Sequence, residues 1–300
     1  MLKVSNSPHI KAKNTTFSIM LDVIIALTPC VIAGMHFFGT HAGLLIAVSL
    51  ISSYTFEYLW CLLLKKPNTA NDLSCVVSGI ILALNLPPTA PLWIPIVGSL
   101  FMIIIVKMLF GGIGQNFMNP AGAARLFLVY SFPIFMGRYI MPLGFDAITT
   151  ATPLALAKMG EYTDLLQMFI GNISGCIGET SSLAILIGFV YLLFRKIIKF
   201  DIPVIYVGVV AVLTAVIGKP VFFYMLSGGL LFGAVFMATD YSSSPITRTG
   251  RIIYAVLLGV MTFTLRFYSS FPEGVVMSIV FMNCLAPLID KWVKPRRFGT

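Results

Sequence analysis

The sequence predicts an all-α polytopic membrane protein, with about ten transmembrane helices in two inverted five-helix repeats that contain broken helices. Composition carries the first part of this prediction, because 58% of the 300 residues are hydrophobic and only 10% are charged. The mean hydropathy of +0.95 is likewise that of a membrane protein. The spacing of the polar residues carries the second part, since they divide the chain into apolar stretches of membrane-spanning length.

Ten apolar segments follow one another between two basic tails, residues 1–17 and 291–300. The segments are residues 18–38, 42–64, 73–87, 91–109, 117–137, 181–198, 202–218, 221–239, 252–268 and 272–290. The third segment ends at Pro87-Pro88 and the eighth runs into Asp240, so both are predicted to be broken or half-length helices. The longest gap, residues 138–180, is predicted to be an external loop between two membrane halves, residues 18–137 and 181–290.

Basic residues determine the predicted orientation, because Lys and Arg gather on the cytoplasmic side of membrane proteins. With the N-terminus inside, 15 of the 20 Lys and Arg residues lie at inner ends, Lys107 among them, and 4 lie outside, Arg266 among them. Arg125 lies within a predicted helix. Both termini are therefore predicted to be cytoplasmic. The same bias explains the net charge of +9 without nucleic acid as a partner.

An internal echo supports two related halves. Residues 77–82, Val-Ser-Gly-Ile-Ile-Leu, recur as residues 226–231, Leu-Ser-Gly-Gly-Leu-Leu. Gly98 recurs as Gly259, and residues 119–121 have a loose counterpart in residues 283–287. Five spans in each half would make the second half inverted relative to the first, and the two broken segments would occupy matching places, where such folds bind their ligands.

Polar side chains enter the fifth segment at Asn116, Asn119 and Arg125. An arginine inside a span costs about 2.5–3.5 kcal/mol on insertion scales unless it is paired. The three residues therefore either line a polar membrane site or belong to a glycine-rich cytoplasmic turn that leads into a helix face of small residues.

A second polar group follows the eighth segment and consists of Asp240, Ser242, Ser243 and Ser244. The serines either cap a helix or offer oxygen atoms to a flavin or Na⁺. Asp240 has two readings, which Asp22 and Glu57 share. Such acids either pair with arginine or cap a helix, or they face a cation or proton pathway.

No metal site or soluble nucleotide domain is predicted on this chain. The residues His9, His36 and His41 lack metal-ligand spacing, and the five cysteines include no C-x-x-C pair. No glycine-rich phosphate loop follows a strand. Any chemistry on a nicotinamide must therefore take place on another subunit.

The most polar stretch near mid-chain is Asp146–Leu154, with Thr149, Thr150 and Thr152 before Pro153. Proline biases the preceding residue toward an extended conformation. The pattern predicts a Thr152 hydroxyl held out to water on a loop. The alternative is an ordinary turn that contains β-branched residues.

This stretch resembles the threonine flavinylation motif, Ser/Thr-x-Ala-Thr preceded by Asp, of a family of membrane subunits. The family contains the D-type subunit of the Rnf complex and the B-type subunit of the Na⁺-translocating NADH:quinone reductase. In that family the last threonine carries FMN through a phosphoester bond. The resemblance places FMN on Thr152, with Thr149, Ala151 and Asp146 as the other motif positions. The chain departs from many members at Thr150, where they have glycine.

Other stretches resemble the same family, so the resemblance extends over about residues 57–290. They are residues 84–93 with Leu-Asn-Leu-Pro-Pro, residues 110–121 with Phe-Gly-Gly-Ile-Gly-Gln-Asn, and residues 238–251 with Ala-Thr-Asp-Tyr-Ser-Ser-Ser-Pro. The short region before the first span favours the D-type subunit of the Rnf complex. The resemblance implies a multi-pass protein of the prokaryotic cytoplasmic (inner) membrane, with the flavin loop outside.

The resemblance further implies a subunit of an ion-translocating ferredoxin:NAD⁺ oxidoreductase, which relays electrons coupled to Na⁺ or H⁺ movement and has no complete active site of its own. The implied partners are a second flavinylated subunit, iron–sulfur membrane subunits, cytoplasmic cluster- and nucleotide-binding subunits, a flavin transferase and membrane lipid. A second, non-covalent flavin between the halves is a further implication. The alternative function is a cofactor-free transporter or channel for a small polar solute or ion.

Overall fold

The computed structural model describes residues 15–142, 151–269 and 274–294. The elements named in these ranges are all helices: α1 (Thr16–Leu63), η1 (Ala70–Asp72), α2 (Ser74–Leu84), α3 (Trp93–Leu100), η2 (Phe101–Met108), α4 (Pro120–Ser131), α5 (Pro133–Met136), α6 (Pro153–Lys158), α7 (Leu165–Ile170), α8 (Ser182–Phe194), α9 (Asp201–Val216), α10 (Val221–Leu226), α11 (Leu230–Phe232), η3 (Gly233–Met237), α12 (Arg248–Tyr268) and α13 (Val275–Trp292). Of these, η1 is a 3-10 helix, and η2 and η3 are π-helices.

Helix α1 contains the first two predicted segments and the turn between them. Gly39 interrupts its 48 residues with a φ of 73° and a ψ of −160°, a conformation that residues with a Cβ rarely adopt. A straight helix of this length would rise about 72 Å, more than twice the hydrocarbon thickness of a bilayer. The turn leaves two arms, each long enough for one crossing.

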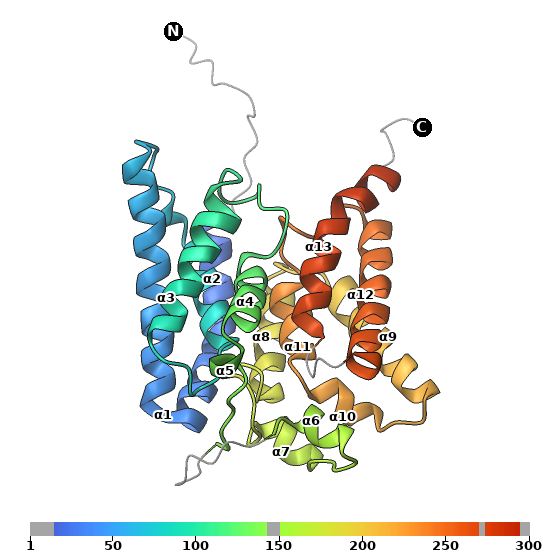
Figure 1. Cartoon of the computed structure of the whole chain (residues 1–300). Coiled ribbons are helices and arrows are strands. Elements are labelled where there is room, and N and C mark those ends of the chain that lie inside the picture. Colours follow the sequence, from blue (N-terminus) through green and yellow to red (C-terminus); the bar gives the residue numbers. More distant parts are fainter. Residues whose placement is uncertain (1–14, 143–150, 270–273, 295–300) are drawn as a thin grey trace.

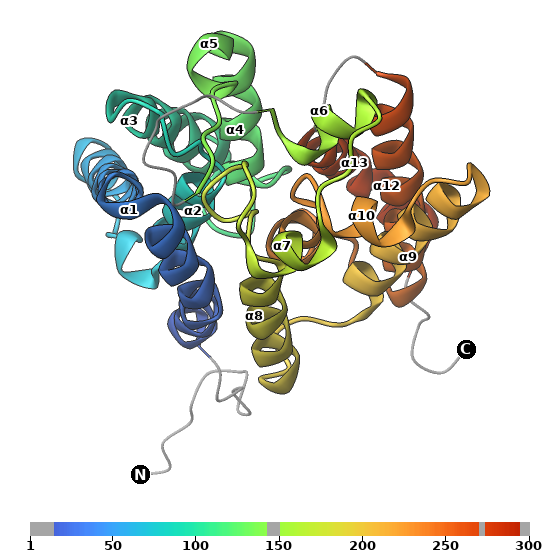
Figure 2. The same ribbon diagram turned by 90° about the horizontal axis from the view of Figure 1, so that it is seen from below.

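The helices form a bundle with two distinct ends. The first residues of α1 and the last residues of α13 lie at one end, whereas α6, α7 and α10 lie at the other (Figure 1). Viewed along the bundle, α1, α2 and α3 lie on one side and α9, α12 and α13 on the opposite side, with α7 and α8 between them (Figure 2). The helix that follows Thr152 therefore lies at the end opposite to the start of α1 and the end of α13.

The two segments predicted to be broken are indeed broken. Helix α2 has 11 residues and ends at Leu84, shortly before Pro87-Pro88. Its rise of about 16 Å is roughly half of a hydrocarbon core. The eighth segment is divided into α10, α11 and η3, with Gly228 and Gly229 at the break in left-handed conformation, at φ values of 60° and 65°.

Backbone carbonyl groups at the broken end of α2 find partners inside the protein, as a membrane requires. The backbone N–H of Gly178 donates to the carbonyl of Leu84 at 2.8 Å, and that of Ile177 donates to the carbonyl of Leu86 at 3.1 Å. Residues 173–182 are buried, because they fold inward to make these bonds. This last part of the predicted external loop is therefore packed inside the protein.

The broken end of α10 is closed by a side chain. The Arg266 guanidinium, on α12, donates to the carbonyls of Tyr224 and Ser227 at 2.8 Å each and to that of Gly228 at 3.2 Å. Arg266 is only 3% exposed. The sequence placed this cation at the outer end of a span, so its burial against helix carbonyls is a difference from the prediction.

The predicted all-helical membrane fold is confirmed. Within the described residues, three helices are long and apolar enough to cross a membrane: α1, α12 and α13. Shorter apolar helices occupy residues 74–84, 93–108, 182–194 and 201–216. The number of spans and the inverted repeat remain predictions.

The contact between Gly178 and α2 generates a stability prediction. A Cβ at Gly178 would lie 2.5 Å from the Cβ of Leu84, whereas one at Gly208 on α9 would meet open space. We expect Gly178→Ala to lower the free energy of unfolding in detergent by about 1–3 kcal/mol through overpacking. Gly208→Ala, the matched control, is expected to raise it by up to about 1 kcal/mol. Equal effects of the two variants would contradict the role assigned to this contact.

Candidate functional site

Thr152 is not held out to water, so this part of the prediction was wrong. The residue is 8% exposed and is the N-cap of α6, where its Oγ1 accepts a hydrogen bond from the N–H of Ala155 at 3.4 Å. The reason is Pro153, which occupies the first position of α6, where its fixed φ suits a helix start. The extended conformation predicted before the proline is confirmed by a ψ of 155° at Thr152.

The other motif positions are only partly described. Ala151 is exposed, and its carbonyl accepts a hydrogen bond from Ser174 Oγ at 2.6 Å, which ties the start of α6 to the inward-folded residues 173–182. Asp146 and Thr149 lie outside the described residues.

Thr152 lines a cavity of about 300 Å³, which we call the Thr152 cavity. Its polar wall is formed by Asn85, Arg125 and Glu179. Apolar side chains of α4, α5 and α13 form most of the rest: Leu126, Val129, Met136, Val275 and Val276. A volume of this size is at the lower end of the range for small-molecule sites, and mostly apolar walls with a few convergent polar groups are typical of them.

Arg125 and Glu179 form a buried ion pair in this wall. The Arg125 Nη1 donates to Glu179 Oε1 and also to Asn85 Oδ1, the latter at 2.7 Å. Arg125 is 3% exposed and Glu179 is 9% exposed. This pairing offsets the free-energy cost of placing an arginine inside a membrane helix, the cost that the sequence analysis identified for Arg125.

The backbone around Glu179 determines where its carboxylate lies. Glu179 directly follows Gly178, whose N–H is bonded to the end of α2. On the opposite side, a Cβ at Gly229 would lie 2.8 Å from Glu179 Cδ, so only a glycine allows this approach. Glu179 therefore lies between the end of α2, to which its backbone is tied through Gly178, and the glycine that precedes α11.

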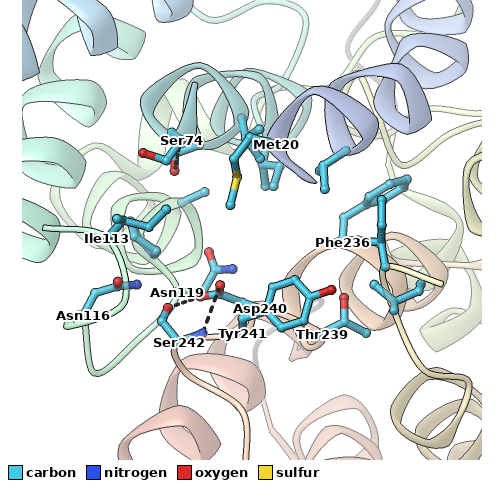
Figure 3. A pocket seen from close by; sticks show the side chains of 18 of the residues that line it. Met20, Ser74, Ile113, Asn116, Asn119, Phe236, Thr239, Asp240, Tyr241 and Ser242 are labelled. Carbon is cyan, nitrogen blue, oxygen red and sulfur yellow. Dashed lines mark hydrogen bonds between the residues drawn. The ribbon is translucent and has the colours of Figure 1, made fainter. Parts of the chain in front are cut away.

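A second cavity, of about 100 Å³, lies near Asp240, and we call it the Asp240 cavity (Figure 3). Asn116, Asn119 and Asp240 line it together with Ser74 and Lys107. The structure thus brings together three of the predicted polar residues from both halves of the chain.

The three predicted serines contact Asp240 in different ways. The hydroxyls of Ser242 and Ser243 donate to Asp240 Oδ2 at 3.0 and 2.9 Å. Ser244 uses its backbone N–H, which donates to the carbonyl of Asp240 at 3.1 Å. Burial raises the pKa of the Asp240 carboxyl above its ordinary value, and the serine hydrogen bonds oppose this shift because they favour the charged form.

The two cavities are separated by contacts between the halves. Asn119 caps α4, and its Nδ2 donates to the carbonyl of Met237, the last residue of η3, at 3.3 Å. Met237 also lines the Thr152 cavity, where Asn85 Nδ2 approaches its sulfur at 3.7 Å. When the amide of Asn283 is oriented by its partners, its oxygen accepts from the Asn119 N–H at 3.0 Å and its nitrogen donates to the Ser243 carbonyl at 3.3 Å.

The two other acids that the sequence analysis named, Glu57 and Asp22, have cationic partners. Glu57, which is fully buried, binds Lys107 Nζ at 2.6 Å, and the same Nζ donates to Ser74 Oγ at 2.6 Å. Asp22 pairs with Arg195 at 3.0 Å, the arginine pairing expected of a structural acid. Lys107 was expected at the cytoplasmic end of its span, but it is 2% exposed, because Glu57 and Ser74 hold it inward.

Sequence reasoning missed three residues of these sites: Asn85, Lys107 and Glu179. The residues that contact each of these three lie far away in the sequence, so no local pattern reveals the contacts. Weak signals were present, since Glu179 is an isolated acid at the edge of an apolar segment and Asn85 lies two residues before Pro87-Pro88. Within the described ranges, no cluster of three or more His, Cys, Asp or Glu side chains could hold a metal ion.

The fold and the two cavities define a helical membrane protein with charged side chains buried between its helices, a feature that marks ion and substrate pathways. Comparison with known proteins gives the family. Residues 3–299 match the model of the NQR2, RnfD, RnfE family, and the chain belongs to this family.

The relatives of the chain cover nearly its whole length. It is 50% identical to the D-type subunit of the Na⁺-translocating ferredoxin:NAD⁺ oxidoreductase complex of Acetobacterium woodii, with 99% of this chain and 95% of the relative aligned. It is 39% identical to the D-type subunit of the proton-translocating ferredoxin:NAD⁺ oxidoreductase complex of Clostridium ljungdahlii, over 99% and 96% of the two chains. The D-type subunit of the ion-translocating oxidoreductase complex of Stutzerimonas stutzeri is 38% identical over 94% and 91%.

The Glu57–Lys107 pair is expected to be strongly coupled. Lys107→Met leaves a buried carboxylate without its cation, which should lower the free energy of unfolding by about 3–5 kcal/mol. Glu57→Gln combined with Lys107→Met removes both charges and should be more stable than Lys107→Met alone. Unfolding of the single and double variants in detergent measures the coupling. Strictly additive losses would show that the two residues do not stabilise each other.

Asp240 is expected to make stability depend on pH. Because the folded state raises its pKa, the folded protein binds more protons than the unfolded chain, and stability falls as the pH rises from the ordinary value of 3.8 to the raised folded value. Asp240→Asn removes the ionisable carboxyl group and therefore this fall in stability with rising pH. We therefore expect the stability of the variant relative to wild type to increase through that window and then to level off. A difference in unfolding temperature that is constant with pH would contradict this.

Proposed function

We propose that this chain is the D-type membrane subunit of an ion-translocating ferredoxin:NAD⁺ oxidoreductase complex, with FMN attached to Thr152 through a phosphoester. Its family and the names of its full-length relatives support the complex. The observation that supports the cofactor is the position of Thr152, whose side chain lines a cavity of about 300 Å³ with a buried arginine in its wall. When bound, FMN supplies electron transfer in one-electron or two-electron steps.

The hydrogen bond made by Thr152 is compatible with this modification. Oγ1 accepts from the Ala155 N–H and so uses a lone pair, not the hydroxyl proton. Ester formation replaces that proton and leaves the capping bond in place. Thr152 would then hold the phosphate in the Thr152 cavity, with Arg125 and Asn85 as donors in the wall.

A second, non-covalent flavin between the halves is part of the same proposal. The Asp240 cavity supports it by its place and its lining, not by its volume of about 100 Å³, which is below the range for small-molecule sites. It lies between the two halves and is lined by hydrogen-bonding groups from both: Ser74, Asn116 and Asn119 from the first, and Asp240 and Ser242 from the second. The alternative, a cofactor-free transporter, accounts equally well for buried polar groups. It gives no role to a threonine at the edge of the larger cavity.

We further propose ten membrane spans in two inverted halves, because each predicted segment contains helix. Lys107 fastens the start of the broken α2 through Ser74, and Arg266 fastens the end of the broken α10. Lys107 lies near the end of the fourth predicted segment and Arg266 near the end of the ninth. These two segments have the same place in the two halves, as an inverted repeat requires. The residues Asn119 and Asn283, matched by the sequence echo, meet between the halves.

In this topology both termini are cytoplasmic and α6 is external. This is supported by Figure 1, where the first residues of α1 and the last residues of α13 lie at the end of the bundle opposite to α6. The proposed partners are a second flavinylated subunit, iron–sulfur membrane subunits and cytoplasmic cluster- and nucleotide-binding subunits, with a flavin transferase that acts on Thr152. The pumped ion is Na⁺ or H⁺, because one relative is named for each.

A flavin-attachment experiment tests the proposal. The full chain is expressed with a flavin transferase, denatured and separated by electrophoresis, and flavin fluorescence is read in the gel. We expect a fluorescent band for wild type and complete loss of it for Thr152→Ala, because the variant lacks the ester oxygen. Peptide mass should place FMN within residues 146–158.

Thr152→Ser is the matched control. It keeps both the hydroxyl and the helix cap, so it should retain fluorescence, whereas Thr152→Ala also loses about 1 kcal/mol of capping. Equal yields of folded protein for the two variants exclude misfolding as the cause. Absence of fluorescence from wild type with an active transferase would refute the covalent flavin and favour the transporter.

A further inference from the structure

The Arg125–Glu179 ion pair faces the cavity that Thr152 lines, and we propose that this pair sets the reduction potential of the flavin held there. The inference rests on the proposed function, because it concerns the cofactor on Thr152. It goes further in assigning an electrostatic role to two residues that do not themselves carry the flavin.

The pair lies in the wall of the Thr152 cavity, so it is close to any ring placed inside. Arg125, Glu179, Thr152 and Ala155 all line the same volume of about 300 Å³. The side chains of Arg125 and Glu179 are 4% and 8% exposed, so water screens their charges little. A unit charge acts far more strongly in such surroundings than at the protein surface.

The two charges act on the ring in opposite directions. A flavin that accepts electrons gains negative charge, which the Arg125 guanidinium stabilises and the Glu179 carboxylate opposes. The intact pair has no net charge, and its effect comes from its fixed orientation. Arginine cannot lose its proton in a protein, so removing the Glu179 carboxylate takes one negative charge out of the wall while the Arg125 guanidinium keeps its positive charge.

The structure holds both groups in place. Asn85 Oδ1 accepts from Arg125 Nη1 at 2.7 Å, and the Gly178 N–H bond to Leu84 fixes the backbone beside Glu179. Gly229 closes the other side of the carboxylate. Charges fixed before electrons arrive stabilise the charged state without the cost of reorganisation.

Asn85 links the pair to the junction between the halves. Its Nδ2 donates to the carbonyl of Ile81 at 2.7 Å and approaches Met237 Sδ, and the Met237 carbonyl accepts from Asn119 Nδ2. The pair that we assign to the flavin therefore touches the ends of both broken helices. A purely structural ion pair would explain these contacts equally well, so the test must read the potential and not only stability.

The test is a spectroelectrochemical titration of the full chain, purified in detergent after expression with the flavin transferase. Soluble redox mediators carry electrons between the electrode and the flavin. Glu179→Gln keeps an oxygen that can accept from Arg125 Nη1 but removes the negative charge. We expect it to favour reduced flavin at least tenfold at a fixed potential, about 59 mV for a one-electron step.

Two further variants separate charge from packing. Arg125→Gln with Glu179→Gln has no net charge, as in wild type, and should return the potential most of the way to the wild-type value. Lys158→Gln removes one unit of charge, of the opposite sign, at an exposed position on α6 and should leave the potential nearly unchanged. Should Glu179→Gln fail to fold, Arg125→Gln at alkaline pH tests the opposite sign, because it leaves the carboxylate alone.

Each outcome has one meaning. The inference is supported if the reduction potential of the flavin rises in the Glu179→Gln variant and the double variant reverses this rise. Two results overturn the inference, provided that flavin is attached at wild-type yield. One is an unchanged potential in Glu179→Gln, and the other is a shift of the potential in the same direction in Glu179→Gln and Arg125→Gln. Absence of flavin from wild type refutes the proposed function instead. The titration of Thr152→Ala gives the contribution of any flavin bound elsewhere, which is subtracted.

Discussion

The need to satisfy the ends of two broken helices inside a membrane determines much of this structure. Hydrocarbon offers no hydrogen bonds, so a helix that stops in mid-bilayer must find donors for its last carbonyls within the protein. At α2 the donors are backbone N–H groups of residues 177 and 178, and at α10 the donor is the Arg266 guanidinium. The first solution requires residues 173–182 to fold inward, which brings Glu179 next to Arg125.

The candidate site follows from that arrangement. The break in α10 is closed by Arg266 beside Gly228, and Gly229 then lies against Glu179, so both breaks converge on the Thr152 cavity. Leu154 of α6 packs against Gly228, since a Cβ there would lie 2.2 Å from Leu154 Cδ1. Thr152, the Arg125–Glu179 ion pair and the broken helices are therefore one packed unit. A change in one of them alters the packing around the others.

Local sequence patterns predicted the helical membrane class, both broken segments, the extended backbone at Thr152 and the polar character of Asn116, Asn119 and Arg125. They failed where the outcome depends on contacts between distant residues. The Thr152-Pro153 pair predicts an exposed loop, but in the structure it begins a helix. No local rule reveals that this helix packs against Gly228. Lys107 and Arg266 counted correctly as basic residues near span ends, yet each points inward, because helix ends and acids from earlier segments provide better partners than water.

The order in which the buried charges leave the ribosome has a consequence for biogenesis. Lys107 and Arg266 follow their partners in the chain, so each is compensated as soon as it is made. Arg125 precedes Glu179 by 54 residues, and Asp22 precedes Arg195 by 173. Among the described residues, the first half therefore inserts into the bilayer with two charges, Asp22 and Arg125, whose ion-pair partners Arg195 and Glu179 are synthesised later. It cannot mature as an independent unit, and its assembly must wait for the second half to arrive.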